Sequence, residues 1–211
     1  MKKCKWFLWP LLASSVFLIR CGNDSAGSPL LQGRIAVDSL ESLQIAYSLS
    51  GDVLEMAYEE ITPAEDGSFS FDIELPEKTL DADIYVDNAI FGVHLEQGKT
   101  AVVEITRDDS GVVGIAFSGD NADLSRVYNA CTRAFDIMKY FSPDPAEAKS
   151  PDEYRALLDS EYARLKQEIA TLDEGAERTC YERLSRGKYE WSHLRILMDQ
   201  AFDEGKKFNE Y

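Results

Sequence analysis

The sequence predicts an α+β protein in two segregated halves, an N-terminal antiparallel β-sandwich or open barrel followed by a helical hairpin or three-helix extension. Three observations predict this. Up to residue 118, apolar residues alternate with polar ones at the period of a half-buried strand. Turn sequences rich in Gly, Asp and Asn separate these runs at roughly ten-residue spacing. From Gly119 onward, apolar residues recur instead at the helical period of 3.6.

Residues 1–21 have the pattern of an export signal. Three lysines precede the apolar run Trp6–Ile19, which holds 14 residues. As a helix this run reaches about 21 Å, which is short of the roughly 30 Å hydrocarbon core of a bilayer. We therefore expect a signal peptide rather than a permanent membrane span.

The end of this segment, Leu18-Ile19-Arg20-Cys21, resembles the lipobox of bacterial lipoproteins, in which the cysteine carries the lipid. We expect lipidation at Cys21. There are two alternatives. The signal is cleaved further along the chain, near residues 26–28, or it is not cleaved and serves as a tether. Residues 22–29 are small and polar and suit a flexible tether between lipid and domain.

Residues 30–118 are expected to form the β domain. The clearest strand is Ser68–Leu75, in which Phe69, Phe71, Ile73 and Leu75 would share one buried face. Shorter alternations place Ile45, Tyr47 and Leu49 inward in one strand, and Val113, Ile115 and Phe117 inward in another. The expected strands are Leu31–Val37, Gln44–Leu49, Val53–Ile61, Ser68–Leu75, Ala82–Val86, Ile90–Leu95, Ala101–Thr106 and Val112–Phe117.

Residues 119–211 are expected to form the helical region. A first helix begins behind a cap at Asp120 or Asn121. A second begins at Ser150-Pro151-Asp152-Glu153, a capping box with proline at the first helical position. A third spans about Ala176–Phe202. Their expected apolar stripes are Leu124, Val127, Tyr128, Cys131, Phe135, Met138 and Phe141 in the first, Leu158, Tyr162, Leu165, Ile169 and Leu172 in the second, and Leu184, Trp191, Leu194, Met198, Ala201 and Phe202 in the third.

Charge excludes one large class of function. The chain has 22 Lys and Arg against 38 Asp and Glu, so its formal charge is 22 − 38, or −16. Binding to nucleic acid needs a cationic face that neutralises phosphates, and this balance has the opposite sign. Motifs for phosphate-binding loops, dinucleotide binding and a serine nucleophile elbow are all absent from the sequence. We expect no catalytic residue, no cofactor and no metal.

Individual chemistry-bearing residues have structural explanations. His94 lies in an expected strand without a Cys or second His nearby, and His193 lies on a helix with no acid or nucleophile at local spacing. Asp81-Ala82-Asp83 lacks the spacing of a calcium loop and predicts a solvated turn. Trp191 is expected in the core. Cys131 and Cys180 are either a disulfide, if the protein is exported, or two buried apolar residues of helix stripes.

The order of these features resembles the N-terminal region of the thioredoxin-like envelope lipoproteins of the TlpA/ResA type. The lipoprotein-like signal is followed by Leu31-Gln32-Gly33-Arg34-Ile35, Asp66-Gly67-Ser68-Phe69-Ser70-Phe71, Phe91–Lys99, Phe117–Leu124 and then long paired helices. In that family a β-rich accessory domain precedes a thioredoxin domain carrying Cys-x-x-Cys. This chain ends at Tyr211 without that motif, so the resemblance implies a stand-alone accessory region or a gene interrupted before its catalytic part.

The sequence thus favours a non-enzymatic, lipid-anchored binding or scaffold module of the bacterial cell envelope, in the periplasm or at the outer membrane. Its expected contacts are a membrane, through the lipid anchor, and an envelope protein partner. Two alternatives remain open. One is a truncated or accessory part of a thiol-disulfide oxidoreductase, acting through Cys131 and Cys180. The other is a carbohydrate-binding or adhesive module, which requires exposed aromatic residues on the sandwich.

Overall fold

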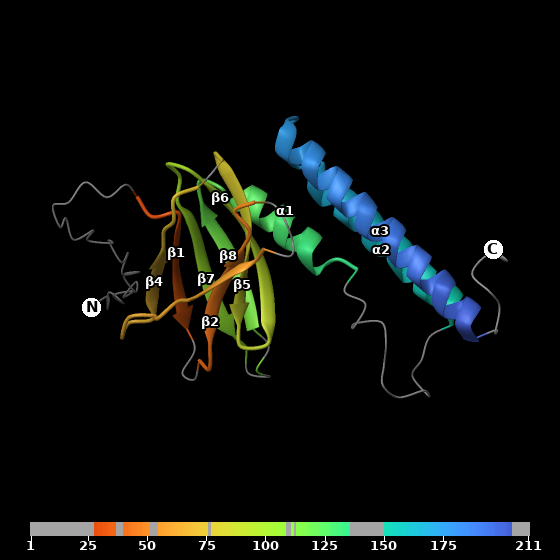
Figure 1. Ribbon diagram of the computed structural model, residues 1–211, viewed down its shortest axis with the longest axis horizontal. Helices are drawn as coiled ribbons and strands as arrows, with labels where there is room; N and C mark the ends of the chain where they lie inside the picture. The colour runs from red at the N-terminus through yellow and green to blue at the C-terminus, as the bar shows by residue number, and fades with distance from the viewer. Residues whose placement is uncertain are drawn as a thin grey trace, which may run out of the picture.

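Two four-stranded sheets precede three helices in the computed structural model, which describes residues 28–36, 40–50, 55–75, 77–108, 111, 113–135 and 150–203. The sheets stack as a sandwich at one end of the molecule, and two long helices run side by side at the other (Figure 1). The elements are β1 (Leu31–Ala36), β2 (Leu43–Tyr47), β3 (Ala57–Glu60), β4 (Ser68–Phe71), β5 (Thr79–Val86), β6 (Ala89–Glu96), β7 (Ala101–Arg107), β8 (Val113–Gly119), α1 (Ala122–Arg133), α2 (Pro151–Ile169) and α3 (Ala176–Asp203). The predicted α+β class, with strands first and helices after them, is correct.

The strand orders are β4-β1-β7-β8 in one sheet and β3-β2-β5-β6 in the other. Every pairing is antiparallel except that of β1 with β7, which is parallel with Leu31 opposite Ala101. The expectation of a purely antiparallel sandwich is therefore wrong at this pair. Parallel neighbours need a long crossover connection. The chain supplies it because β2, β3, β5 and β6 lie between β1 and β7 in sequence and all belong to the other sheet.

Alternation in β4 positions the sandwich core as expected. Phe69 and Phe71 are each 7% exposed, whereas Ser68 and Ser70 face solvent. The strand ends at Phe71 rather than at Leu75, although Leu75 is still buried against the same core. Leu49 was expected inward but is 49% exposed, because β2 ends two residues earlier at Tyr47 and the alternation no longer applies beyond it.

Helix α1 covers β6, the edge strand of its sheet. An edge strand presents unpaired N–H groups, and two of those in β6 are satisfied by side chains of this helix. The Gly92 N–H donates to Asn129 Oδ1 at 3.1 Å, and the His94 N–H donates to Ser125 Oγ at 3.1 Å. The approach is close because Gly92 has no side chain: a Cβ there would lie 2.7 Å from Tyr128. The helix is thereby held against the sandwich.

Helix α1 ends at Arg133, whereas its stripe predicted a helix as far as Phe141. Phe135 has φ +58°, a left-handed conformation that a bulky side chain adopts only when its surroundings hold it. Its N–H leaves the helical hydrogen-bond ladder and donates to Glu161 Oε2 of α2 at 3.0 Å. Met138 and Phe141 lie outside the described residues.

Helices α2 and α3 form an antiparallel hairpin (Figure 1). The predicted capping box begins α2, where the Ser150 side chain accepts from the Glu153 N–H and the Glu153 carboxylate accepts from the Ser150 N–H. Between the helices the Tyr162 and Tyr189 rings stack with centroids 4.3 Å apart. The predicted bounds of α3 are close to those observed.

The buried face of α3 agrees with the predicted one only in part: Leu184 packs against the helical core as expected. Trp191 is 61% exposed and Leu194 is also exposed, so their expected burial is wrong. The residues that turn inward are Tyr181, Ser185, Ser192 and Ile196. Ser185 and Ser192 satisfy their hydroxyls by donating to backbone carbonyls three and four residues earlier, which lets two polar residues lie in a buried stripe.

Candidate functional site

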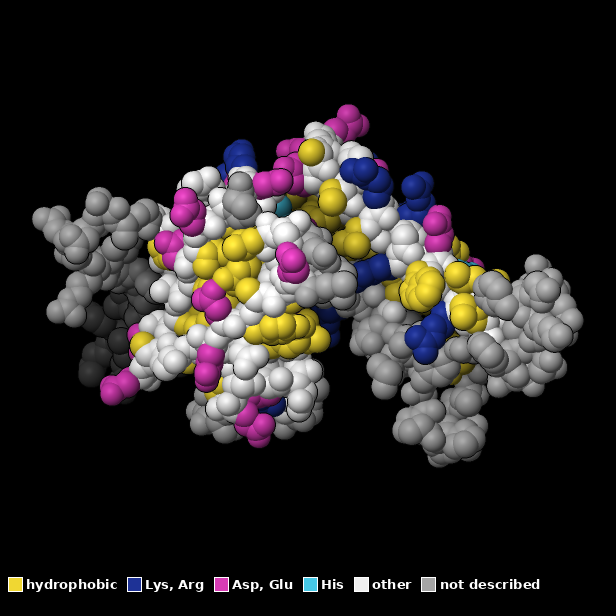
Figure 2. All heavy atoms as spheres, in the orientation of Figure 1, with side chains coloured by type: hydrophobic (Ala, Val, Ile, Leu, Met, Phe, Trp, Pro, Cys, Tyr) yellow, Lys and Arg dark blue, Asp and Glu magenta, His cyan; other side chains and the backbone are white. Residues whose placement is uncertain are grey.

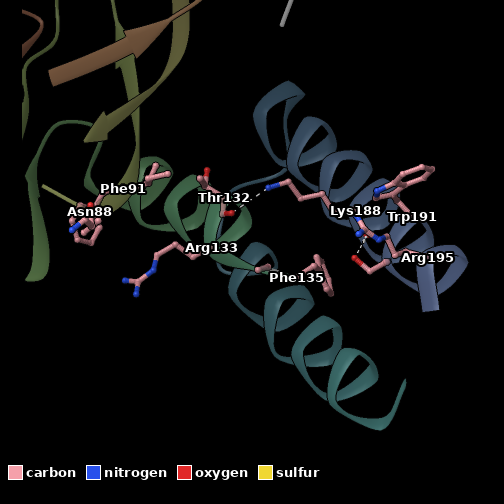
Figure 3. A pocket seen from close by; sticks show the side chains of 12 residues that line it. Asn88, Phe91, Thr132, Arg133, Phe135, Lys188, Trp191 and Arg195 are labelled. Carbon is pink, nitrogen blue, oxygen red and sulfur yellow. Dashed lines mark hydrogen bonds between the residues drawn. The ribbon is translucent and has the colours of Figure 1, made fainter. Parts of the chain in front are cut away.

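A pocket of about 610 Å³ lies where β6, the end of α1 and the middle of α3 meet, and we call it the junction pocket. Figure 3 shows Phe91 and Arg133 on one side of it and Trp191 and Arg195 on the other. Its volume falls within the range of small-molecule and peptide sites. The residues that line it are Asn88, Ala89, Ile90, Phe91, Thr132, Arg133, Ala134, Phe135, Lys188, Trp191, Ser192 and Arg195.

The junction pocket has the opposite charge to the chain. Among the described residues its lining includes Arg133, Lys188 and Arg195 but neither Asp nor Glu, although the whole chain carries −16. On the face shown in Figure 2, several Lys and Arg side chains lie along the helices, and Asp and Glu side chains lie over both the strands and the helices. At physiological ionic strength charges beyond about 8 Å are largely screened, so the local cations decide which ligand charge is attracted.

Lys188 closes the inner end of the pocket. Its Nζ donates to the carbonyls of Cys131 and Thr132, at 2.8 and 3.3 Å, in the last turn of α1 (Figure 3). These carbonyls lack intrahelical partners, and a cation is favourable at a helix C-terminus. Burial lowers the pKa of Lys188, and the nearby carboxylate of Asp83 opposes that shift. The lysine therefore fastens α3 to α1 while contributing positive charge to the pocket.

Aromatic and apolar groups form the remaining surface. Phe91 and Phe135 are buried at its base, and the Arg133 guanidinium lies over the Phe91 ring at 5.5 Å, in the range of a cation–π contact. Trp191 stands at the rim with most of its indole open to solvent. An indole of this exposure beside guanidinium groups can pack against the apolar part of a ligand whose acidic part the cations hold.

The four cysteines are placed as follows. Cys21, the expected lipidation site, and Cys4 lie outside the described residues. Cys131 is fully buried and Cys180 is exposed, and both are free thiols, so the disulfide left open from the sequence is not formed here. Burial raises the pKa of Cys131 to about 12, which keeps the thiol protonated at neutral pH. A buried, protonated thiol is a poor nucleophile.

Both histidines make contacts that local sequence did not indicate. His94 is buried on β6, and its Nδ1 lies 2.7 Å from Asp81 Oδ1. His193 Nε2 lies 3.3 Å from Asp159 Oδ1 on α2, and the His193 ring packs edge-on against Tyr189. Within the described ranges no group of three His, Cys, Asp or Glu side chains is arranged to hold a metal ion. Nor does any helix of that part combine the length and apolarity needed to cross a bilayer.

Sequence reasoning did not find the junction pocket. Its lining comes from three segments, near residues 90, 133 and 191, that are distant along the chain. No spacing within one segment links Arg133 to Arg195. The signal that was present is Trp191, one helical turn before Arg195, and the pattern of apolar residues assigned this tryptophan to the core.

Comparison with known proteins identifies no relative: no family model, curated protein or solved structure matches the chain. The resemblance to thioredoxin-like envelope lipoproteins therefore stays a prediction.

Proposed function

We propose that the protein is a non-enzymatic, lipid-anchored binding module of the bacterial cell envelope, and that its junction pocket holds an acidic, partly apolar segment of another envelope protein. The location rests on the export signal and on Cys21, and the binding role rests on the pocket. One observation carries the binding role: a cationic, aromatic pocket whose described lining holds no acidic residue, in a chain of charge −16.

The shape of the pocket favours a ligand with more than one acidic group. Arg133 and Arg195 lie on opposite sides in Figure 3, with Lys188 between them. Carboxylates form charge-assisted hydrogen bonds with guanidinium groups, often through both nitrogens. Trp191 offers apolar surface beside the cations. A short peptide that alternates acidic and aromatic residues fits this arrangement better than a single small anion.

Two alternatives predict different sites. A redox role needs an accessible thiol of low pKa, and the raised pKa of Cys131 argues against it. A carbohydrate-binding role would use exposed aromatic rings such as Trp191 without needing the cations. The charge dependence of binding therefore separates a peptide site from a neutral saccharide site.

The test uses Trp191 as the reporter. The other two tryptophans are Trp6 and Trp9, so a Trp6→Phe and Trp9→Phe double variant of the full chain leaves only the pocket indole. Its fluorescence is titrated with acetyl-Glu-Phe-Glu-amide and with the matched neutral peptide acetyl-Gln-Phe-Gln-amide. We expect the acidic peptide to bind more tightly and its affinity to fall as NaCl is added.

Arg195→Gln supplies the protein side of the same test. Loss of one exposed ion pair costs about 1 kcal/mol at most, which raises the Kd about fivefold. Arg186→Gln is the matched control, because Arg186 is exposed on the same helix and faces Glu190 rather than the pocket. Equal affinity for the two peptides, or equal losses from both arginine variants, would refute the proposed site. Binding of neutral oligosaccharides with an affinity that does not change as NaCl is added would instead favour the carbohydrate alternative.

Anchoring is tested separately. Cys21→Ser should abolish incorporation of labelled fatty acid and release the protein from membranes, because stable attachment requires multiple acyl chains. An unchanged labelled membrane fraction would refute lipidation at Cys21 and would leave the binding proposal standing.

A further inference from the structure

A second pocket, of about 660 Å³, lies on the outer face of the β5 and β6 strands beneath the start of α3, and we call it the acidic pocket. Its charge is opposite to that of the junction pocket. Asp81, Asp83, Glu77 and Glu177 all line it, and neither Lys nor Arg is among its lining residues in the part of the chain that the structure describes. The two aspartates were expected in a solvated turn. They lie instead within β5, two residues apart, so both project from one face of the sheet towards the helices.

Asp81 is held in a fixed orientation. Its Oδ1 lies 2.7 Å from His94 Nδ1, and it accepts from the Tyr181 hydroxyl at 3.0 Å. Its side chain is 31% exposed, and its Oδ2 has no hydrogen-bond partner among the described residues. A carboxylate anchored through one oxygen is pre-organised to accept from a ligand with the other, which lowers the entropic cost of binding.

Two further acceptors, on residues that line this pocket, lack donors. Asp83 Oδ1 and His94 Nε2 are both buried without a hydrogen-bond partner in the described part of the chain. His94 is almost fully buried, with only 4% of its side chain exposed. If His94 Nδ1 donates to Asp81, its Nε2 is a bare acceptor. Because a buried polar group without a partner is costly, such a cluster favours a ligand that brings donors and no acceptor.

The walls suit the apolar part of such a ligand. Tyr128 lines the pocket as a partly exposed ring, and it stacks on the buried Tyr181 ring behind it with centroids 5.9 Å apart. Aromatic faces attract ammonium groups. Leu49, which is half exposed, and Met56 add aliphatic surface at the mouth. The combination of oriented carboxylate, aromatic faces and aliphatic mouth matches a cation on a short hydrocarbon chain.

We propose that the acidic pocket binds a primary alkylammonium group, which donates to Asp81 Oδ2 and lies against the Tyr128 ring. An ammonium group has three donors and no acceptor, so it meets the needs of this site directly. The same chemistry is offered by a free alkylamine and by a lysine side chain of a protein. The site does not depend on ligand binding at the junction pocket.

The test compares n-butylammonium with n-butanol, its neutral counterpart of similar size, by calorimetric titration and by amide NMR shifts of the full chain. We expect n-butylammonium to bind at least tenfold more tightly and to shift the amides of β5 and the start of α3. A third arm, Nα-acetyl-lysine-N-methylamide, distinguishes the source: tighter binding than n-butylammonium indicates a lysine of a protein, and weaker binding indicates a free amine.

Asp81→Asn should weaken n-butylammonium binding at least tenfold while leaving the weak butanol binding unchanged. Asp123→Asn is the control, since Asp123 is an exposed acid of α1 that pairs with Arg126 outside the pocket. Circular dichroism checks that each variant is folded, and Asp83→Asn replaces Asp81→Asn if the latter is not. Equal binding of amine and alcohol to the unaltered chain, or equal effects of Asp81→Asn and Asp123→Asn, would overturn the proposal.

Discussion

Gly92 tests whether α1 is packed against the sandwich as described, because both pockets depend on that contact. A Cβ at this position would lie 2.7 Å from Tyr128 Cδ1 and 2.7 Å from Thr132 Oγ1. Tyr128 cannot move aside freely, since its ring is stacked on that of Tyr181. Gly92→Ala therefore forces the helix and the strand apart or strains the tyrosine.

The magnitude follows from two opposing effects. Forcing one extra methyl into a packed contact costs about 1 to 3 kcal/mol. Replacing glycine inside a strand by alanine gains about 0.5 to 1 kcal/mol, because the unfolded chain loses freedom. Taken at the middle of each range, the two effects leave a net loss of about 1.2 kcal/mol. With a urea dependence of about 2 kcal/mol per molar, the unfolding midpoint should fall by about 0.6 M.

Gly187→Ala is the matched control. Nothing lies within 4 Å of a Cβ at this position on α3, so the added methyl meets open space. Alanine is about 1 kcal/mol more favourable than glycine inside a helix, and the same substitution should therefore raise the midpoint. Urea unfolding followed by circular dichroism measures both variants. A Gly92→Ala protein as stable as the parent, or stabilised like Gly187→Ala, would refute the packing of α1 on β6.

Three further predictions use other parts of the molecule. Phe71→Ala should cost about 3 to 5 kcal/mol in urea unfolding and Ser70→Ala almost nothing, since adjacent strand residues face opposite sides; equal losses would contradict the alternation. Iodoacetamide followed by peptide mass mapping should label Cys180 in the native protein and Cys131 only after unfolding, and native labelling of Cys131 would show that its thiol is accessible. Two backbone N–H donors and a guanidinium hold the pKa of Asp87 below its usual value, so its contribution to stability is present above about pH 4 and is lost as pH falls through the folded pKa. Asp87→Asn should therefore lower the free energy of unfolding at pH 7 and make it depend less on pH in the acid range. An unchanged acid dependence would exclude this role.

Local pattern predicted the elements well because their periods are set by immediate neighbours. All eight expected strands overlap observed ones, and the capping box at Ser150 begins α2 as predicted. The parallel pairing of β1 with β7 joins residues about seventy positions apart, and the alternation of residues within a strand does not indicate which strand it pairs with. Part of the buried face of α3 was missed because Ser185 and Ser192, which hydropathy counts as polar, are buried with their hydroxyls bonded to their own helix.

The candidate sites are formed by residues that are distant in sequence, so most of their geometry could not be predicted from local sequence patterns. Asp81 and His94 were recognised as residues with chemistry, but their pairing requires β5 and β6 to adopt one register, with Asp81 opposite His94. Tyr181 reaches the same carboxylate from a helix a hundred residues later. At the junction pocket, Trp191 is exposed, yet it follows the helical spacing of an apolar stripe. The sequence pattern therefore could not distinguish it from a core residue.

The most direct test of the proposed binding role is an amide NMR map of the full chain during titration with acetyl-Glu-Phe-Glu-amide. The account predicts that the largest shifts cluster at the start of β6, around Thr132 and Arg133 at the end of α1, and around Trp191 and Arg195 on α3. Shifts that centre on Asp81 and Tyr181, or that spread evenly over the sandwich, would contradict it.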